Sequence, residues 1–230
     1  YNQAAKFRYM FGGKAECPMV VRTMAGAGLR GGAQHSQNLT QMVTMVPGLK
    51  VVCPTNAYDA KGLLIQAIRD NDFVEDKFLY ETSCEVPDEP YAIPFGEANF
   101  LREGTDVTIV GISNTVNKAV AVADRLALEG ITCDVIDPRT TSPFDEEAII
   151  ESVETTGRLV IVDEMTPRCG LAADISSIVA EKAFGALRAP IKKVTAAHSP
   201  IPFAPALEDA WMPQEADIEA AVREVLGYKR

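Results

Sequence analysis

Short apolar runs rich in β-branched residues alternate with helical patterns along most of this sequence. Strands are predicted at residues 18–22, 50–53, 77–81, 106–112, 133–136, 158–162 and 191–195. Helices are predicted between and after them, at residues 57–69, 115–128, 142–153, 171–184 and 216–226. A helix between two strands provides the crossover that a parallel pair of strands requires. The pattern therefore predicts an α/β fold with two parallel-sheet units.

Two of the helices have recognisable starts. Asn56 is expected to cap the helix over 57–69, with Asp59 three residues later, and the apolar residues of this helix recur on one face. Ser142 is expected to cap the helix that runs to Val153, with Pro143 in its first position.

A proline-rich stretch divides the pattern. Residues 85–94 contain three prolines among acidic residues, which excludes a central strand or a helix interior. We expect a first unit over residues 1–84, a linker over 85–100 and a second unit over 101–230.

Composition and charge narrow the class of protein. Apolar residues make up 47% of the chain, which is enough for a core and argues against disorder. The net charge of −10 disfavours nucleic acid and anionic membranes as partners. No run approaches the roughly 18 uninterrupted apolar residues of a membrane-spanning helix. The five cysteines are odd in number and lack C-x-x-C spacing, which argues against a disulfide framework and against a zinc site.

Residues 26–31 (GAGLRG) match the G-x-G-x-x-G pattern that follows a strand in dinucleotide-binding proteins. Such a site also needs an acidic residue about 20 positions later, at the end of a second strand. The strand predicted at 50–53 is not followed by a carboxylate until Asp59, inside the next helix. A nicotinamide site is therefore disfavoured, and the better interpretation is a loop whose backbone comes close to another group.

His35 follows this loop, where a helix is predicted to begin. A lone histidine is more often structural or solvated than catalytic, so both interpretations stay open. A helix N-terminus favours the neutral imidazole, which can donate or accept a hydrogen bond near neutral pH. His35 is the candidate catalytic residue, whereas His198 lies in a proline-flanked loop that favours a structural role.

Acidic residues at element ends form two further candidate sites. Asp70 and Asp72 end the helix predicted over 57–69, where a polar helix end is the usual interpretation. The alternative is an all-oxygen cation site, because the last helical carbonyls lack internal partners. Asp163 and Glu164 end a strand at the edge where open α/β sheets bind ligands, although a subunit contact explains them equally well.

Ten short runs, in order along the whole chain, resemble one known family. Seven resemble the beta subunit of pyruvate and branched-chain 2-oxo acid dehydrogenases: FRYMFGG (7–13), PMVVR (18–22), AQHSQ (33–37), PGLKVV (47–52), DAKGLL (59–64), AIRD (67–70) and RTTSP (139–143). Three look more like the acetoin dehydrogenase branch: IPFGEA (93–98), AFGAL (183–187) and HSPIPF (198–203). These are transketolase-like thiamine diphosphate enzymes.

The resemblance implies a fold and a function. The first unit would be the end of a transketolase-like pyrimidine-binding domain, and the second a transketolase C-terminal domain. The protein would be the beta subunit of an acetoin dehydrogenase-like complex that cleaves a C–C bond next to a carbonyl and passes the acyl group to a lipoyl-bearing acyltransferase. Pyruvate or a branched-chain 2-oxo acid is the alternative substrate, and a non-catalytic assembly module is the alternative role.

The resemblance also implies partners, cofactors and a location. The partners would be an alpha subunit, in an α2β2 heterotetramer, and the lipoyl acyltransferase core. Thiamine diphosphate would be shared between subunits, with its aminopyrimidine on the beta subunit and its diphosphate and magnesium on the alpha subunit. The location would be the bacterial cytoplasm, or the mitochondrial matrix in a eukaryote.

Particular residues match the family's sites. His35 matches the active-site histidine that helps to handle substrate or the incoming lipoyl group. The residues that match a potassium site, mostly through backbone carbonyls, are Met19, Ala67, Ile68, Asp70 and Asp72. Asp72 departs from the asparagine expected in the pyruvate enzymes.

The cofactor-binding residues of this family would lie upstream of Tyr1. They include the glutamate that hydrogen-bonds the aminopyrimidine and the aromatic residue that stacks on it. The opening residues also read as the middle of a helix. The chain is therefore expected to be the C-terminal two-thirds of a beta subunit, to carry only part of an active site, and to be inactive in isolation.

Overall fold

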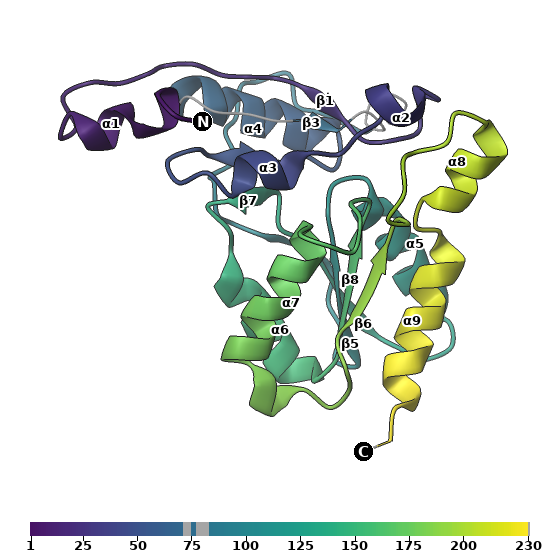
Figure 1. Ribbon diagram of the computed structural model, residues 1–230. Helices are drawn as coiled ribbons and strands as arrows, with labels where there is room; N and C mark the ends of the chain where they lie inside the picture. The colour runs from purple at the N-terminus through teal and green to yellow at the C-terminus, as the bar shows by residue number, and fades with distance from the viewer. Residues whose placement is uncertain (71–74, 77–82, 230) are drawn as a thin grey trace.

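The computed structural model describes residues 1–70, 75–76 and 83–229. Residues 99–229 form a sheet of five strands covered by helices on both faces, and the N-terminal unit lies across one end of this sheet (Figure 1). The α/β class predicted from the alternating pattern is confirmed.

The five-stranded sheet has the order β4-β6-β5-β8-β9. Its strands are β4 (Asn99–Arg102), β5 (Val107–Gly111), β6 (Cys133–Asp137), β8 (Leu159–Asp163) and β9 (Lys192–Thr195). All neighbours are parallel except β4, which pairs antiparallel with β6 at one edge. The expected linker over 85–100 therefore ends inside an edge strand.

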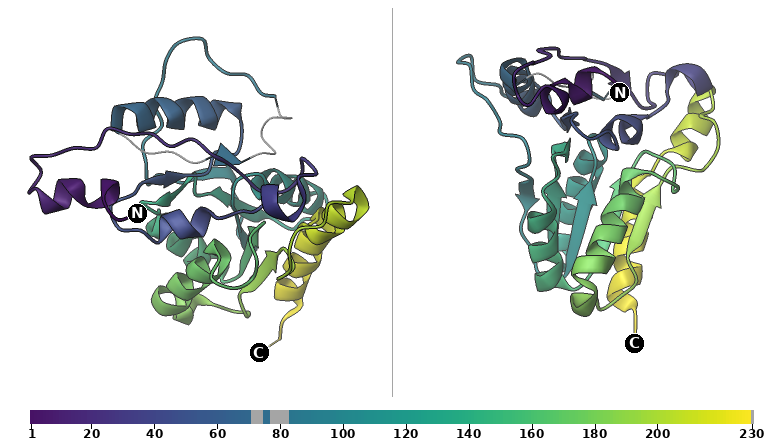
Figure 2. Two further views of the ribbon diagram at one scale, coloured as in Figure 1. Left: turned by 45° about the horizontal axis from the view of Figure 1, so that its top comes forward. Right: turned by 60° about the vertical axis from the view of Figure 1, so that its left-hand side comes forward.

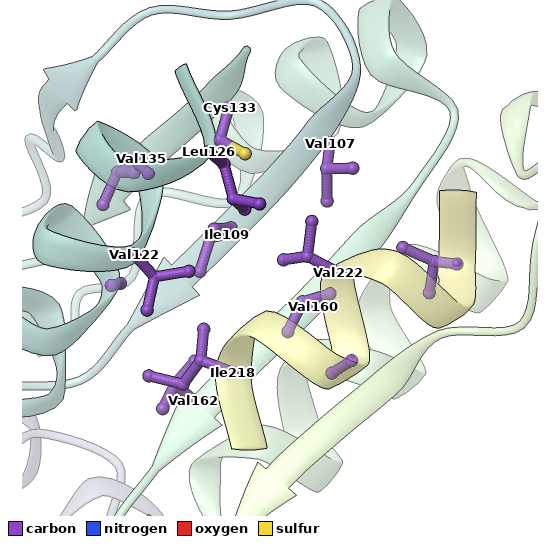
Figure 3. Close-up of a cluster of buried hydrophobic side chains, with 14 of the residues drawn as sticks. Val107, Ile109, Val122, Leu126, Cys133, Val135, Val160, Val162, Ile218 and Val222 are labelled. Atoms are coloured by element: carbon purple, nitrogen blue, oxygen red, sulfur yellow. The ribbon is translucent and has the colours of Figure 1, made fainter. Parts of the chain in front are cut away.

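Alternate side chains of the central strands point to opposite faces, which explains why β5, β6 and β8 are continuous apolar runs. One face, with Ile109, Val135 and Val160, packs against α5 (Thr115–Ala127) and α9 (Glu215–Gly227) (Figure 3). The other face packs against α6 (Glu146–Thr156) and α7 (Leu171–Lys182). Helices thus shield both faces of the sheet from solvent, and the core is centred on β5 and β8.

The N-terminal unit is built from short elements around one longer helix (Figure 2). They are η1 (Ala4–Lys6), α1 (Phe7–Met10), β1 (Met24–Ala25), α2 (Gly32–His35), α3 (Thr40–Thr44), β2 (Val51–Val52), α4 (Ala57–Asp70) and β3 (Glu75–Asp76). β1 and β3 form a parallel pair. β2 instead pairs antiparallel with β7 (Thr140–Ser142), which lies between β6 and α6. The strand at 51–52 was expected, but its partner belongs to the other unit.

The two units contact each other at the carboxyl ends of the parallel strands. After β5, the Ser113 hydroxyl donates to the Pro54 carbonyl at 2.8 Å. After β6, the Arg139 carbonyl accepts from the Cys53 amide at 2.8 Å. The N-terminal unit therefore covers the edge of the sheet where open α/β folds place their ligand sites.

The linker packs along α4. Residues 83–98 contain no helix or strand, as the prolines predicted. The Tyr91 ring stacks on Tyr58 at 4.5 Å, and the Tyr91 hydroxyl donates to the Tyr58 carbonyl at 2.7 Å. Ile93 is buried against Leu63 of α4. These contacts fix the path by which the chain leaves the first unit.

Most predicted helices and strands of the second unit are confirmed to within two residues, and so is the helix over 57–69. Asn56 caps that helix as predicted, because its side-chain oxygen accepts from the Asp59 amide at 2.8 Å. Cys53 and Cys133 are buried, and all five cysteines are free thiols. Within the described ranges no helix has the length and hydrophobicity needed to cross a bilayer.

Two local predictions are wrong. Residues 18–22 are not a strand, and pairing begins only at Met24, where β1 meets β3. Ser142 does not cap α6: it ends β7, and the cap is Asp145, whose carboxylate accepts from the Ala148 amide at 3.2 Å. The strand predicted over 77–81 lies outside the described residues.

Four elements of the described chain after residue 98 were not expected. The edge strand β4, the interface strand β7 and helix α8 (Pro205–Trp211) are short, and η3 (Phe184–Ala186) extends the end of α7 as a separate turn. Segments of three to seven residues give too few periods for a hydrophobic pattern to be read.

The core between the sheet and α5 yields the first prediction. Leu126 is fully buried there, whereas Leu128, two residues on, is 89% exposed. Leu126→Ala should lower the free energy of unfolding by about 2–5 kcal/mol, because it removes buried methyl groups and leaves a cavity. Leu128→Ala is the control and should change it by less than about 0.5 kcal/mol. Denaturant unfolding measures both, and equal losses would contradict this core assignment.

Candidate functional site

Residues 26–37 form a closed loop, here called the glycine loop. Its ends are joined by a hydrogen bond from the Gly26 amide to the Gln37 carbonyl at 3.2 Å. Gly26, Gly28 and Gly32 have φ angles of 91°, 104° and 66°, in the left-handed region that other residues rarely adopt. The first two glycines of the G-x-G-x-x-G pattern thus turn the backbone of a compact Ω-type loop, whereas the third, Gly31, has a φ of −79°.

Two buried carboxylates of the second unit hold the backbone of this loop. The Ala27 amide donates to Glu164 Oε1 at 2.5 Å, and the Gly28 amide donates to Glu208 Oε1 at 3.0 Å. Glu164 follows β8 and is 4% exposed, and Glu208 lies in α8 and is 0% exposed. The expectation that the loop backbone approaches another group is confirmed, and that group is a pair of carboxylates.

Arg30 completes the contact from the loop side. Its guanidinium lies 2.8 Å from Glu208 Oε2 and 2.7 Å from Asp209 Oδ1. Arg30 also has a positive φ of 55°. These hydrogen bonds, led by the one to Asp209, raise the pKa of Arg30. The negative charge of Glu208 is therefore compensated at the interface.

His35 is the last residue of the four-residue helix α2, and its side chain is exposed. The prediction that His35 begins a helix is wrong, because the single helical turn of α2 starts at Gly32 and ends at His35. The helix-dipole argument for a neutral imidazole no longer applies. Its geometry comes instead from the glycine loop: a Cβ on Gly31 would lie 3.0 Å from His35 Cβ and 2.9 Å from Ser36 Oγ.

A cavity of about 510 Å³ lies beside the glycine loop, between the two units. The loop side contributes Ala33 and Gln37, and the second unit contributes Glu164 and Trp211; the remaining lining residues are Asn38, Leu39, Met165, Thr166, Ser199, Pro200 and Ile201. The lining mixes apolar side chains with a carboxylate, an amide and hydroxyls. Such a cavity, at the carboxyl end of β8, has the character of a small-molecule site.

Asp163 and His198 border this region in different ways. Asp163 is fully buried, and its carboxylate accepts from the Met165 and Ala172 amides at 3.0 and 3.2 Å. Burial raises the pKa of Asp163 to about 6. It fixes the turn into α7, which is a structural role. His198 is exposed and precedes Ser199 of the cavity lining.

The candidate cation residues are only partly brought together. Ala67, Ile68 and Asp70 lie in the last turn of α4, where terminal carbonyls lack helical partners. The Asp70 carboxylate forms an ion pair with Lys50. Met19 is exposed, next to Val20, which packs against the cluster that contains Ala67. Asp72 lies outside the described residues. Within the described parts of the chain, no three His, Cys, Asp or Glu side chains form a metal-binding group.

A second buried polar contact joins the units. The Asp59 carboxylate of α4 lies 3.0 Å from the Arg139 guanidinium, and Asp59 is 1% exposed. Burial raises the pKa of Asp59, against the effect of Arg139. Asp137, fully buried beside them, accepts from the Arg139 amide at 2.8 Å. Burial raises the pKa of Asp137 to about 7, against hydrogen bonds from Thr55 and Arg139.

Sequence reasoning missed the residues that join the units. Glu208, Arg30, Asp59 and Arg139 each lie in an ordinary charged context, and their partners are distant in the chain. The available signal was the glycine pattern at 26–31. It predicted that the loop backbone comes close to another group, but it did not identify that group.

Two domain families match the sequence. The transketolase pyrimidine-binding domain matches residues 1–80, and the transketolase C-terminal domain matches residues 96–218. A solved structure described as a split gene transketolase, inactive beta4 tetramer, superposes with a TM-score of 0.75 at 25% identity, covering 92% of this chain and 67% of that one.

Curated relatives are similar over nearly the whole chain. The beta subunit of acetoin:2,6-dichlorophenolindophenol oxidoreductase from Cupriavidus necator is 58% identical over 98% of this chain and 68% of its own length. The protein of the same name from Bacillus subtilis is 53% identical, over 98% of this chain and 67% of its own. The pyruvate dehydrogenase E1 beta subunit of Rickettsia felis is 49% identical, over 99% of this chain and 71% of its own.

The buried acid Asp137 gives the interface a specific pH dependence. Its pKa is raised from about 4 in the unfolded chain to about 7, so its contribution to stability is full below about pH 4 and is lost as the pH rises through 7. The free energy of unfolding of Asp137→Asn, minus that of wild type, should therefore increase by about 1–4 kcal/mol as the pH rises from 5.5 to 8. Denaturant unfolding across this range measures the difference.

The matched control is Asp174→Asn, which changes an exposed carboxylate on α7. Its difference from wild type should stay constant over the same pH range. A constant difference for Asp137→Asn as well would contradict the raised pKa.

Proposed function

The chain belongs to the family of dehydrogenase beta subunits built from transketolase pyrimidine-binding and C-terminal domains, and from this membership we propose that it is the beta subunit of an acetoin dehydrogenase. The choice of acetoin as substrate rests on the order of sequence identities. They are 58% and 53% to beta subunits of acetoin:2,6-dichlorophenolindophenol oxidoreductase, 49% to a pyruvate dehydrogenase subunit and 39% to a 2-oxoisovalerate dehydrogenase subunit. The reaction is cleavage of the C–C bond next to a carbonyl, with transfer of the acyl group to a lipoyl-bearing acyltransferase.

Family membership implies thiamine diphosphate, which supplies the carbanion chemistry when bound. We propose that this chain contributes to the aminopyrimidine side of a shared site. The glycine loop and the cavity of about 510 Å³ support this, because they combine an exposed imidazole with a mixed polar and apolar lining. Magnesium and the diphosphate are proposed to lie on the alpha subunit, as the family resemblance implies.

His35 is the proposed catalytic residue of this chain. Its imidazole is exposed at the end of α2, so it can meet a substrate that approaches between subunits. A histidine there can hold or donate a proton at the substrate oxygen, or at the sulfur of the incoming lipoyl group. The loop that carries it is fixed to the second unit, which suits a residue that must be held in place.

The partner of a beta subunit in this family is an alpha subunit. We propose an α2β2 assembly that docks on a lipoyl acyltransferase core. Large exposed apolar side chains of the N-terminal unit support a partner surface; they include Tyr9, Met10, Phe11, Met45 and Ile68. The proposed location is the bacterial cytoplasm, or the mitochondrial matrix in a eukaryote.

A potassium site remains a proposal, with Met19, Ala67, Ile68, Asp70 and Asp72 as its residues. The backbone carbonyls at the end of α4 fit a cation. The Asp70 carboxylate fits less well, because Lys50 already neutralises it. Potassium binding would therefore rest on carbonyls, and a melting temperature that rises in potassium chloride but not in choline chloride would support it.

Substrate preference tests the main proposal. A full-length beta subunit that contains this sequence is assembled with its alpha subunit and assayed with acetoin, pyruvate and 3-methyl-2-oxobutanoate, with 2,6-dichlorophenolindophenol as electron acceptor. We expect kcat/KM for acetoin to exceed the others by at least about tenfold, because the described residues that line the cavity include the carboxylate Glu164 and no cationic side chain to pair with a substrate carboxylate. A preference for either oxo acid would overturn the choice of acetoin, and no activity with any substrate would favour an assembly module.

The role of His35 gives a separate prediction. His35→Ala should lower the rate of acyl transfer to the lipoyl group by about 10²–10⁴-fold, because it removes a general acid–base group. The dissociation constant of thiamine diphosphate should change by less than about threefold. Gln34→Ala, the exposed neighbour in α2, is the control. Equal losses in cofactor binding and transfer would contradict the assignment.

A further inference from the structure

The glycine loop reaches the second unit through side chains that come from two separate elements. Glu164 follows β8, and Glu208 lies in α8, 44 residues further along the chain. They accept from consecutive amides, those of Ala27 and Gly28. We call these two carboxylates and the amides they hold the glutamate clamp.

Burial makes the clamp costly to open. Both carboxylates are almost completely shielded from water, so an amide or a carboxylate that lost its partner would stay unsatisfied. Cations lie close to each acid: Arg30 at 2.8 Å from Glu208, and Lys118, whose pKa is lowered by burial against the effect of Glu164. The contact is thus a compensated, charge-assisted pair of hydrogen bonds.

The loop transmits this anchoring to His35 through close packing. Gly31 leaves no room for a Cβ, because His35 and Ser36 lie directly behind it. Gly32 packs against the Phe203 ring of the second unit, with a Cβ position 3.4 Å from that ring. The loop closes on itself at Gln37, two residues after His35. A shift of Ala27 and Gly28 would therefore move the short helix α2.

We propose that Glu164 and Glu208 are positioning residues for His35. By holding the glycine loop, the clamp sets where the imidazole stands relative to the cavity between the units. The catalytic consequence rests on the role of His35 under the proposed function, whereas the mechanical link between the carboxylates and the loop does not. Glu208 does not line the cavity and acts only through the loop, whereas Glu164 also lines the cavity, so the tests below are made at Glu208.

The mechanical link is tested by hydrogen–deuterium exchange, followed by mass spectrometry, on the full chain assembled with its alpha subunit. Glu208→Ala removes the acceptor of the Gly28 amide and should speed exchange in the peptide over residues 26–37 by about tenfold. Glu208→Gln keeps an acceptor oxygen and should speed it less. Exchange in α5 should not change.

The control for both variants is the corresponding change at Glu129. Glu129 also pairs with an arginine, Arg223, at 2.8 Å, but its side chain is half exposed on the surface. Glu129→Ala and Glu129→Gln should leave exchange over residues 26–37 unchanged. Unchanged exchange in both Glu208 variants would overturn the clamp.

The catalytic link is tested by a double-mutant cycle on acyl transfer, in a full-length beta subunit assembled with its alpha subunit. Glu208→Ala should lower kcat by about ten- to a hundredfold with little change in KM, because a small misplacement of a catalytic group is costly. In the His35→Ala background the same change should cost less than about twofold, since the group it positions is gone. Glu208→Gln should restore most of the activity.

Each result decides the proposal. An equal loss in the wild-type and His35→Ala backgrounds would mean a merely structural role and would overturn it. If Glu208→Ala does not fold, Glu208→Asp decides in the two backgrounds in the same way, because its shorter side chain withdraws the carboxylate from the Gly28 amide. If His35→Ala itself keeps full activity, the proposed catalytic role of His35 fails, while the exchange measurement still reports whether the clamp holds the loop.

Discussion

Buried carboxylates that accept hydrogen bonds across the junction of the two units are the constraint on which this structure depends. Glu164 and Glu208 hold the glycine loop, and Asp59 meets Arg139. The apolar cluster near the loop is small, with Ala27, Ile201 and Met212 at its centre. A junction held mainly by directional polar contacts allows few alternative arrangements, because any shift leaves a buried charge without its partner.

The packed sheet fixes the positions of the carboxylates that lie at its strand ends. Glu164 directly follows β8, a strand buried on both faces, and Asp137 ends β6 in the same sheet. Each position is therefore set by the packed core and not by a flexible loop. The N-terminal unit has short elements and a small core of its own, so it takes its geometry from the strand ends that it covers. The position of His35 is in this sense determined by the second unit.

The sequence predicted much of the fold and less of the site. β5, β6 and β8 were predictable because strands buried on both faces are continuous apolar runs, and α5 and α9 because their apolar positions repeat. The domain boundaries, and the roles of His35 and the cation residues, stay predictions. The partners of the glycine loop could not be predicted, since Glu208 lies 180 residues away from Gly28 and nothing local marks it as buried. The false helix start at His35 had the same origin, because the glycines were read without the contact that shapes them.

The likeness of residues 26–31 to a dinucleotide-binding loop has a physical basis. Glycines with positive φ turn successive amides toward one side, and such a nest of N–H groups binds an anion. In a nucleotide-binding protein that anion is a phosphate from outside. Here the amides of Ala27 and Gly28 are occupied by Glu164 and Glu208, so the anion is part of the protein. The same backbone chemistry that would capture a ligand serves here to join two units, and the missing acid after the second strand is consistent with that difference.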